Sequence, residues 1–208
     1  MTPIVFDCDG VLVDSEMLAW DAWREVLARY GTAPSDADVE LLTGRSEADA
    51  YDHFVARVTL PDPQRFSDEL SVAIAERFLT SLETFEDVED TLEALLARDV
   101  PLAVASSSSR QRLAFTLSST GLDRFFSVVV AGDEVDAGKP EPDIFLEAAR
   151  RLGYPPEDCV AVEDTPAGVM AAKRAGMFVV AIQRTGHGDL GAADRVVPRL
   201  TPASVVVG

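Results

Sequence analysis

The sequence is short of basic residues, and this shortage limits the partners that the protein can bind. Its 18 Lys and Arg residues stand against 36 Asp and Glu residues, which gives a formal net charge of −18. Such an acidic chain is a poor match for nucleic acid or for an anionic membrane, because phosphate backbones are bound by Lys and Arg. A small phosphorylated ligand remains compatible where a local cation offsets the negative field.

Cysteines and long apolar segments are also scarce. Cys8 and Cys159 are the two cysteines, and both stand in apolar, strand-like runs. This placement predicts buried, reduced thiols without a disulfide framework, which is typical of a reducing compartment. No apolar run reaches the ~18 residues of a membrane span, and the chain begins with strand sequence instead of a signal peptide. We therefore expect a cytoplasmic protein, either a monomer or a weak homo-oligomer.

What the sequence does contain is a series of short apolar runs separated by helical patterns. Unbroken runs of this kind predict strands buried on both faces, as in a parallel sheet. They fall at Ile4–Phe6, Leu102–Ala105, Val128–Val130, Cys159–Val162, Phe178–Ile182 and, more weakly, Val196–Val197. From residue 83 onward the alternation of strand and helix predicts a doubly wound α/β layer.

Residues 15–82 interrupt this alternation. Apolar residues recur there at helical spacing, first at Trp20, Trp23 and Leu27, and later around Leu70 and Ile74. We interpret this segment as an all-helical cap that is inserted after the first strand. Residues 1–14 and 83–208 then form the α/β catalytic core.

Four of the predicted strands are followed by residues with useful chemistry. Ligands of open α/β sheets bind at the carboxyl ends of strands. The residues that follow these strands are Asp7 and Asp9, Ser106, Lys139, and Glu163 with Asp164. A lysine in this place is less often incidental than elsewhere, because the chain contains only two.

Together these residues can bind a metal ion and a phosphate group. Mg²⁺ prefers carboxylate oxygens, which Asp7 and Asp164 supply. Ser106 and the N–H groups of the helix start that follows it can hold phosphate oxygens, while Lys139 adds a fixed positive charge. Phosphoryl transfer depends mainly on such positioning and charge stabilisation. Asp7 can attack phosphorus, and Asp9 can protonate the leaving oxygen and then activate water.

The segments "FDCDGVLVDSE", "VASSSSR", "AGKPEPDIF" and "VEDTPAGVMAAKRAGM" resemble the four motifs of the haloacid dehalogenase superfamily, in the same order. They resemble its helical-cap subfamily, which includes sugar-phosphate phosphatases and β-phosphoglucomutases. The resemblance implies a Rossmann-like core, Asp7 as nucleophile and Asp9 as acid/base. It also implies a phosphate site and a Mg²⁺ site. The implied phosphate ligands are Ser106, Ser107 and Lys139, and the implied metal ligands are Asp7, the main-chain carbonyl of Asp9, and Asp164, with Glu163 alongside.

Some polar residues can be interpreted either as functional residues or as ordinary surface or packing residues. Arg45, in the cap, could meet an anionic or hydroxylated part of the substrate, or be a solvated residue near a helix start. Arg110 could contact substrate or merely balance a nearby acid. His53 fits a surface or packing role better than a catalytic one, and His187 lies in a strand-end loop where an ordinary loop role is favoured.

Departures from the family patterns narrow the set of reactions that we expect the protein to catalyse. Asp9 is absent from true dehalogenases, and the cap has no lysine to serve a phosphonate hydrolase as Schiff base. Ala19 and Glu47 stand where the mutases have a histidine and an arginine, which weakens but does not remove the mutase alternative. The sequence therefore predicts a Mg²⁺-dependent phosphatase for a small phosphorylated metabolite, such as a sugar or sugar-acid phosphate.

An alternative from another class is a receiver-like signalling domain that accepts a phosphoryl group as a switch. Receivers also combine an acceptor Asp, an acidic pair and a Lys on a doubly wound sheet. However, receivers place the acidic pair after the first strand and the acceptor after a later one, and this chain is too long and has an inserted cap. A catalytically idle, ligand-binding relative is disfavoured because all four motifs are intact.

Overall fold

A six-stranded parallel sheet is the centre of the protein. The structure is a computed structural model that describes residues 2–184 and 188–206. The strand order is β3-β2-β1-β4-β5-β6, and every neighbouring pair is parallel. The strands are β1 (Ile4–Phe6), β2 (Leu102–Ser106), β3 (Val128–Ala131), β4 (Val160–Glu163), β5 (Phe178–Ile182) and β6 (Arg195–Val197). Each predicted apolar run therefore forms a strand, within one or two residues at its ends.

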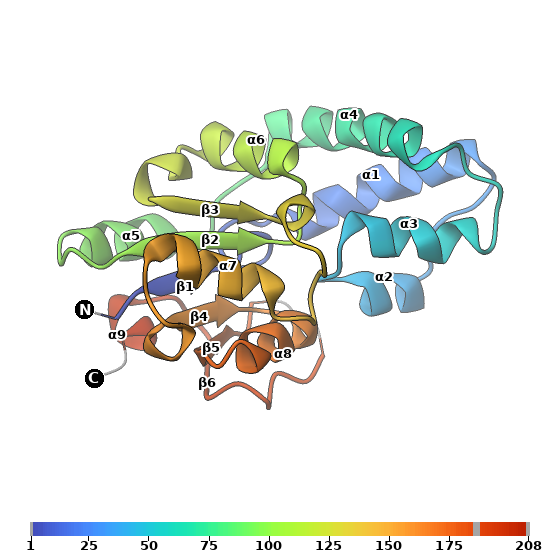
Figure 1. The fold of residues 1–208 in the computed structure, drawn as a ribbon. Helices are drawn as coiled ribbons and strands as arrows, with labels where there is room; N and C mark the ends of the chain where they lie inside the picture. Colours follow the sequence, from blue (N-terminus) through green and yellow to red (C-terminus); the bar gives the residue numbers. More distant parts are fainter. Residues whose placement is uncertain (1, 185–187, 207–208) are drawn as a thin grey trace.

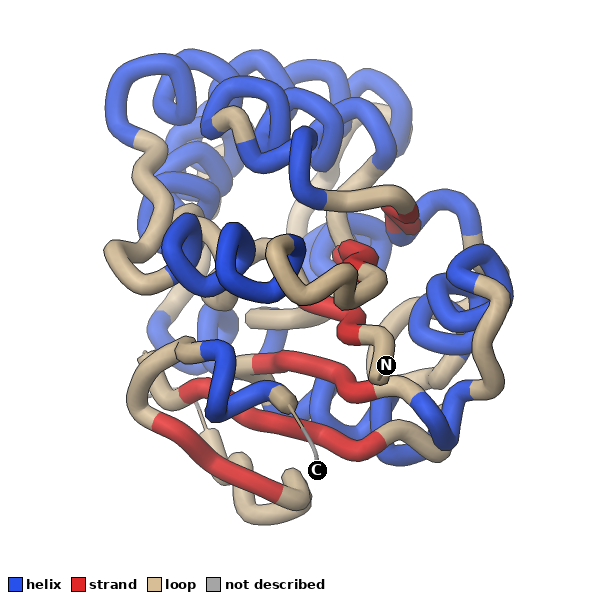
Figure 2. The backbone as a smooth tube through the Cα atoms, turned by 90° about the vertical axis from the view of Figure 1, so that its left-hand side faces the viewer, coloured by secondary structure: helices blue, strands red, loops and turns tan. Residues whose placement is uncertain are grey.

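Helices cover both faces of this sheet (Figures 1 and 2). The helices α5 (Val88–Leu96), α6 (Arg110–Thr120) and α9 (Pro202–Val205) pack on the face that carries Ile4 and Phe6. The opposite face carries Val5 and is covered by α7 (Asp143–Leu152) and α8 (Pro166–Arg174). Three short 3₁₀ helices complete the core, namely η1 (Leu122–Phe125), η2 (Gly132–Glu134) and η3 (Pro156–Asp158). This is the predicted doubly wound α/β fold.

Four further helices lie beyond the carboxyl ends of β1, β2 and β3, where the arrowheads of Figure 1 point. They are α1 (Glu16–Arg29), α2 (Asp36–Leu42), α3 (Glu47–Val55) and α4 (Pro63–Ser81). They share a separate apolar cluster in which the ring of Trp23 lies tilted against the rings of Phe54 and Phe66. The helical character predicted for residues 15–82 is therefore confirmed.

The helical segment leaves and rejoins the core at one place. The N–H of Asp14 donates to the carbonyl of Glu83 at 2.9 Å, and Val13 forms an antiparallel bridge with Thr84. These contacts lie beside the predicted boundaries at residues 14/15 and 82/83, although the division into two domains stays a prediction. Within the described ranges, no helix combines the length and apolar character that crossing a membrane requires.

Candidate functional site

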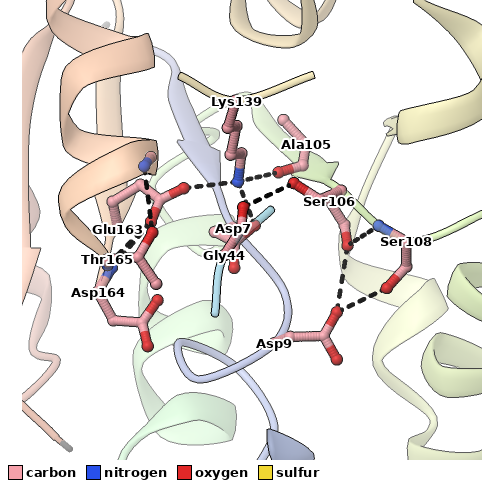
Figure 3. A network of polar contacts seen from close by, with 12 residues as sticks. Asp7, Asp9, Gly44, Ala105, Ser106, Ser108, Lys139, Glu163, Asp164 and Thr165 are labelled. Atoms are coloured by element: carbon pink, nitrogen blue, oxygen red, sulfur yellow. Dashed lines mark hydrogen bonds and ion pairs between the residues drawn. The ribbon is translucent and has the colours of Figure 1, made fainter. Parts of the chain in front are cut away.

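The central strands deliver the predicted site residues to one point. Strand β1 pairs with both β2 and β4, so the residues that follow these strands are neighbours in space. Figure 3 shows Asp7, Ser106 and Glu163 around the side chain of Lys139, with Asp164 farther from it, and Lys139 reaches in from the loop after η2. Residues separated by more than 150 positions in the sequence thus meet at a single edge of the sheet.

Three buried carboxylates form the acidic part of this site. Asp7, Glu163 and Asp164 each offer an oxygen, and these oxygens lie within 4.8 Å of one another. Neither carboxylate oxygen of Asp164 has a hydrogen-bond partner, although the residue is only 1% exposed. A buried carboxylate without a partner is costly unless it is protonated or meets a cation. The oxygen donors suit a hard divalent cation, to which Asp7 and Asp164 could offer carboxylate oxygens.

The acidic group has altered proton affinity as a result of its burial. Burial raises the pKa of Asp7 to about 8, and the negative charges of Glu163 and Asp9 add to this effect, while Lys139 opposes it. Burial also raises the pKa of Asp164, and Glu163 and Asp7 raise it further. Both shifts follow from placing like charges together away from water, and a divalent cation would reverse them.

Lys139 is the internal counterion. Its Nζ donates to Asp7 Oδ1 and to Glu163 Oε1, each at 2.5 Å, and to the carbonyl of Ala105 at 3.2 Å. Burial alone would lower the pKa of Lys139, but the carboxylates of Asp7 and Glu163 outweigh it and raise the pKa. The ammonium group is therefore charged and held against the carboxylates of Asp7 and Glu163.

Glu163 has a supporting role in this structure. One of its oxygens accepts from Lys139, and the other accepts from the N–H groups of Asp164 and Thr165 at 3.0 and 3.3 Å. Gly168 leaves room for this carboxylate, because a Cβ at residue 168 would stand 1.9 Å from Glu163 Oε1. Glu163 thus orients Lys139 and the turn before α8 while it also belongs to the acidic group, and its part in metal binding stays a prediction.

Asp9 lies apart from the acidic group and is held by hydroxyls and an arginine. Ser15 Oγ donates to Oδ1 at 2.5 Å, and Ser108 Oγ and Ser106 Oγ donate to Oδ2 at 2.9 and 3.3 Å. Arg112 Nη2 donates to Oδ1 at 3.2 Å. Burial alone would raise the pKa of Asp9, but Arg112 and these hydroxyls lower it. Asp9 is therefore ionised in this arrangement.

Sequence reasoning missed Arg112, Ser15 and Ser108. The sequence held no clear signal for Arg112, because the residue at which the helix begins decides which of its first side chains faces the site. Ser109 caps α6 by accepting from the N–H of Arg112 at 3.4 Å. Because α6 begins directly after Ser109, the guanidinium of Arg112 lies beside the serine run and against Asp9.

Arg110 is placed elsewhere. Its main-chain N–H donates to Asp133, and its guanidinium donates to the carbonyl of Val129 and pairs with Glu134. It does not line the cavity at the site, which among the described residues includes Arg112 instead. The predicted substrate contact is thus not seen, and the structure agrees with the alternative that Arg110 balances a nearby acid.

The space between the helical segment and the sheet edge is a cavity of about 100 Å³. Ser106, Ser107 and Lys139 line its base. The Ser107 hydroxyl also donates to the carbonyl of Gly44 at 3.2 Å, which ties the serine run to the helical segment. Arg45 lines the cavity too, although its side chain is exposed and its Nε donates to the carbonyl of Leu41.

His53 is not among the described residues that line this cavity. His53 packs edge-on against Phe54 and contacts Asp38 at 2.7 Å, which agrees with its predicted packing role. His187 lies outside the described residues.

The turn after β1 requires a glycine. Gly10 has a φ of +80°, and a Cβ at this residue would stand 2.0 Å from Asp164 Oδ2. The positive φ and the close approach of Asp164 to the backbone thus explain why a glycine follows Asp9.

The fold and the site together define a doubly wound α/β enzyme whose acidic centre lies at the carboxyl ends of its strands. The sequence profile of the family described as haloacid dehalogenase-like hydrolase matches residues 4–182. This match covers most of the chain, and the protein belongs to the haloacid dehalogenase-like hydrolases. The predicted resemblance and the predicted fold class are confirmed, and the receiver-like alternative has no support.

Named relatives and solved structures agree with this membership. The fructose-1-phosphate phosphatase YqaB of Escherichia coli is 33% identical over 184 residues, which cover 86% of this chain and 95% of that protein. The bifunctional riboflavin kinase/FMN phosphatase of Arabidopsis thaliana is 34% identical over 86% of this chain, and the chain spans 48% of its length. The structure of CbbY from Rhodobacter sphaeroides with xylulose-(1,5)-bisphosphate has a TM-score of 0.86 and 27% identity, and all of both chains is covered.

Proposed function

We propose that the protein is a Mg²⁺-dependent phosphatase that hydrolyses small phosphorylated carbohydrates through an aspartyl-phosphate on Asp7. Its enzyme class, a phosphoric monoester hydrolase, follows from the family and from the relatives that are named as phosphatases. The metal, the covalent intermediate and the kind of substrate are the proposed parts.

The observation that carries the proposal is the pairing of Asp7 with an unpartnered Asp164. Asp164 is buried with two free carboxylate oxygens, and an oxygen of Asp7 lies within 4.8 Å of it. Asp7 and Asp164, with the main-chain carbonyl of Asp9, are the residues that would hold Mg²⁺. When bound, the ion would offset the negative charge shared by the carboxylate and the phosphate.

In the first step Asp7 attacks phosphorus through a carboxylate oxygen, and the bond from phosphorus to the leaving oxygen breaks. Lys139 and the serine run at Ser106 and Ser107 bind the phosphate oxygens and stabilise their charge. Asp9 gives its proton to the leaving oxygen. In the second step Asp9 takes a proton from water, and the resulting hydroxide attacks phosphorus and releases Asp7.

These roles require Asp9 to change its partners during the reaction. With Arg112 and Ser15 in contact, the pKa of Asp9 is lowered, which suits the base of the second step. Acting as an acid requires a proton, and Asp9 gains one more readily after it leaves this cationic contact.

We also propose that residues 15–82 act as a cap over the site. The cavity of about 100 Å³ is well below the ~300 Å³ at which small-molecule pockets usually begin. A sugar phosphate would therefore enter only after the cap moves away from the sheet edge. Closure then excludes bulk water from the site during transfer to Asp7.

Hydrolysis is favoured over transfer to a second sugar phosphate. Ala19 and Glu47 line the cavity at the two places where the mutase resemblance calls for a histidine and an arginine. Without these groups water is the acceptor that most easily reaches the phosphorylated Asp7. β-Phosphoglucomutase-type transfer is thus the second candidate.

The test is hydrolysis of p-nitrophenyl phosphate by protein freed of metal with EDTA and then supplied with Mg²⁺. We expect many turnovers with Mg²⁺, little activity without it, and a loss of at least ~1,000-fold in Asp7→Asn. Asp123→Asn, a substitution at an exposed position, is the matched control and keeps its activity. Full activity of a folded Asp7→Asn variant would contradict the nucleophile assignment, and one stable phosphate per protein would contradict turnover.

A further inference from the structure

We infer that Trp20 is the surface on which the leaving group packs, and that the enzyme prefers phosphomonoesters whose leaving group is a sugar ring over those with an open chain. This inference rests on the proposed phosphatase function and narrows its substrates from phosphorylated carbohydrates in general to cyclic ones. It depends on where α1 places its side chains along the cavity and on how the indole of Trp20 is held.

One stripe of α1 and its N-cap leads from the acidic centre into the cavity. The members that line the cavity recur at helical spacing, and they are Ser15, Glu16, Ala19, Trp20 and Trp23. Ser15 contacts Asp9, so this end of the stripe lies where the phosphoryl group would be transferred. Trp20 stands one helical turn beyond Glu16, a rise of roughly 6 Å. A ring that is joined to the phosphate oxygen through one carbon lies at a comparable distance from phosphorus.

The indole of Trp20 is held from two sides. Its Nε1 donates to Thr43 Oγ1 at 3.4 Å, and its ring lies tilted against that of Trp23, with 6.1 Å between the ring centroids. Trp23 is only 5% exposed, because it packs in turn against Phe54 and Phe66. Trp20 is half-buried and lines the cavity, so part of its ring is available to a ligand. A side chain that is fixed before the substrate arrives loses little entropy on binding.

Apolar side chains accompany Trp20 in the lining. They are Ala19, Leu42 and Ala50. Ala19 stands where the mutase resemblance calls for a histidine, so a methyl group replaces a polar ring next to Trp20 in the chain. Such a surface packs against the C–H face of a sugar ring, and stacking of a flat ring on an aromatic side chain is worth roughly tenfold in binding. An open chain would have to fix several bond rotations to bury the same area.

Charge contributes little to selection on this side of the cavity. Glu47 and Arg45 offset each other, a net charge of 1 − 1 = 0. Glu16 lies at the acidic end of the α1 stripe, where its charge acts on Asp164. Thr43 Oγ1 accepts from the indole, and its own proton can be donated to a hydroxyl at the edge of a sugar ring. Shape and contact area therefore decide which leaving group binds best.

The experiment compares kcat/KM for matched substrates in the presence of Mg²⁺. Glucose 6-phosphate and glucitol 6-phosphate have the same number of carbons and the same charge, but the leaving group is a ring in the first and an open chain in the second. We expect kcat/KM to be ~10-fold higher for glucose 6-phosphate. Benzyl phosphate places a ring without hydroxyls at the same distance from phosphorus and should be the poorer substrate of the two ring compounds, because it leaves Thr43 unused. A higher kcat/KM for benzyl phosphate would overturn the assignment to sugar rings.

Substitutions at Trp20 test the cause of this preference. Trp20→Ala should lower the ratio of kcat/KM for glucose 6-phosphate to that for glucitol 6-phosphate by ~10-fold, whereas Trp20→Phe, which keeps a flat ring, should retain roughly half of it. Tyr154→Ala removes an exposed aromatic ring outside the described lining of the cavity and should leave the ratio unchanged. An unchanged ratio in a folded Trp20→Ala variant would overturn the inference.

The outcomes separate this inference from the proposed function. Hydrolysis of p-nitrophenyl phosphate together with an equal or higher kcat/KM for glucitol 6-phosphate would overturn the inference and leave the phosphatase function intact. Absence of hydrolysis for every monoester with Mg²⁺ would overturn both. If Trp20→Ala does not fold, the wild-type substrate pair and Trp20→Phe still decide the question.

Discussion

Replacing Asp164 with Asn should separate the stability of the metal-free protein from its response to Mg²⁺. Asp164 is 1% exposed, has no partner for either carboxylate oxygen, and lies within 4.8 Å of oxygens of Asp7 and Glu163. Two unit charges 4.8 Å apart repel by about 3 kcal/mol at an effective dielectric constant of 20. Protonation of the acidic group and the charge of Lys139 already relieve part of this repulsion. We therefore expect Asp164→Asn to raise the free energy of unfolding of the metal-free protein by ~1–2 kcal/mol.

A gain of this size corresponds to a rise in Tm of roughly 3 to 6 °C for a chain of this length. The assay is thermal unfolding followed by circular dichroism, in EDTA and in Mg²⁺. The wild-type Tm should rise with Mg²⁺ because the ion binds the native state, whereas the variant should lose most of this rise together with its phosphatase activity. Asp123→Asn should match the wild type in both conditions. A variant less stable than the wild type in EDTA, or one with an undiminished response to Mg²⁺, would refute the reasoning.

Four further predictions concern the surroundings of the acidic group. Mg²⁺ affinity, measured by calorimetry, should rise up to tenfold per pH unit toward pH 8, because burial raises the pKa of Asp7 to about 8 and metal binding displaces its proton. In the metal-free protein the native state holds this proton between about pH 4 and 8, whereas the unfolded state does not. The contribution of Asp7 to the free energy of unfolding therefore falls as the pH rises from about 4 to 8. Arg112→Gln should raise the pKa of Asp9 and shift the basic limb of the pH–rate profile to higher pH. It should also lower kcat ~10–100-fold with little change in KM, and Arg112→Lys should keep part of the lost kcat. An unshifted profile would show that Arg112 has only a packing role. Gly168→Ala should lower the free energy of unfolding, measured in urea, by ~1–3 kcal/mol and reduce activity, because the added Cβ would collide with Glu163. Unchanged stability would contradict this contact.

The sheet and its chemistry could be predicted from the sequence because their signals are local. The strands are apolar runs buried on both faces, and Asp7 and Asp164 follow them directly. The parallel order then brings the ends of β1 and β4 together without any information on side-chain contacts. Lys139, which the composition argument singled out, lies between the carboxylates of Asp7 and Glu163, while its phosphate-binding role stays a prediction.

The choice between Arg110 and Arg112 could not be made from the pattern. Only the residue at which α6 begins decides which arginine faces the site. With Ser109 as N-cap, Arg110 is directed toward Glu134 and Arg112 toward Asp9. Helix boundaries are uncertain by a few residues in sequence reasoning, and one residue turns a side chain by about 100° around the helix.

The division of the helical segment into α2 and α3 was missed for a different reason. Each helix is too short for a clear apolar period, with 7 and 9 residues. Their starts were nevertheless readable, because "SDAD" and "SEAD" both form capping boxes, with Ser35 and Ser46 as the N-caps.

The hydroxyl of Ser15 has a mechanical consequence. Ser15 is the N-cap residue of α1, beside Asp14 where the helical segment joins the core, and it holds one oxygen of Asp9. Under the proposed function, a movement of the cap would therefore also displace the residue that is proposed to activate water. Hydrolysis of the phosphorylated enzyme would then depend on the position of the cap.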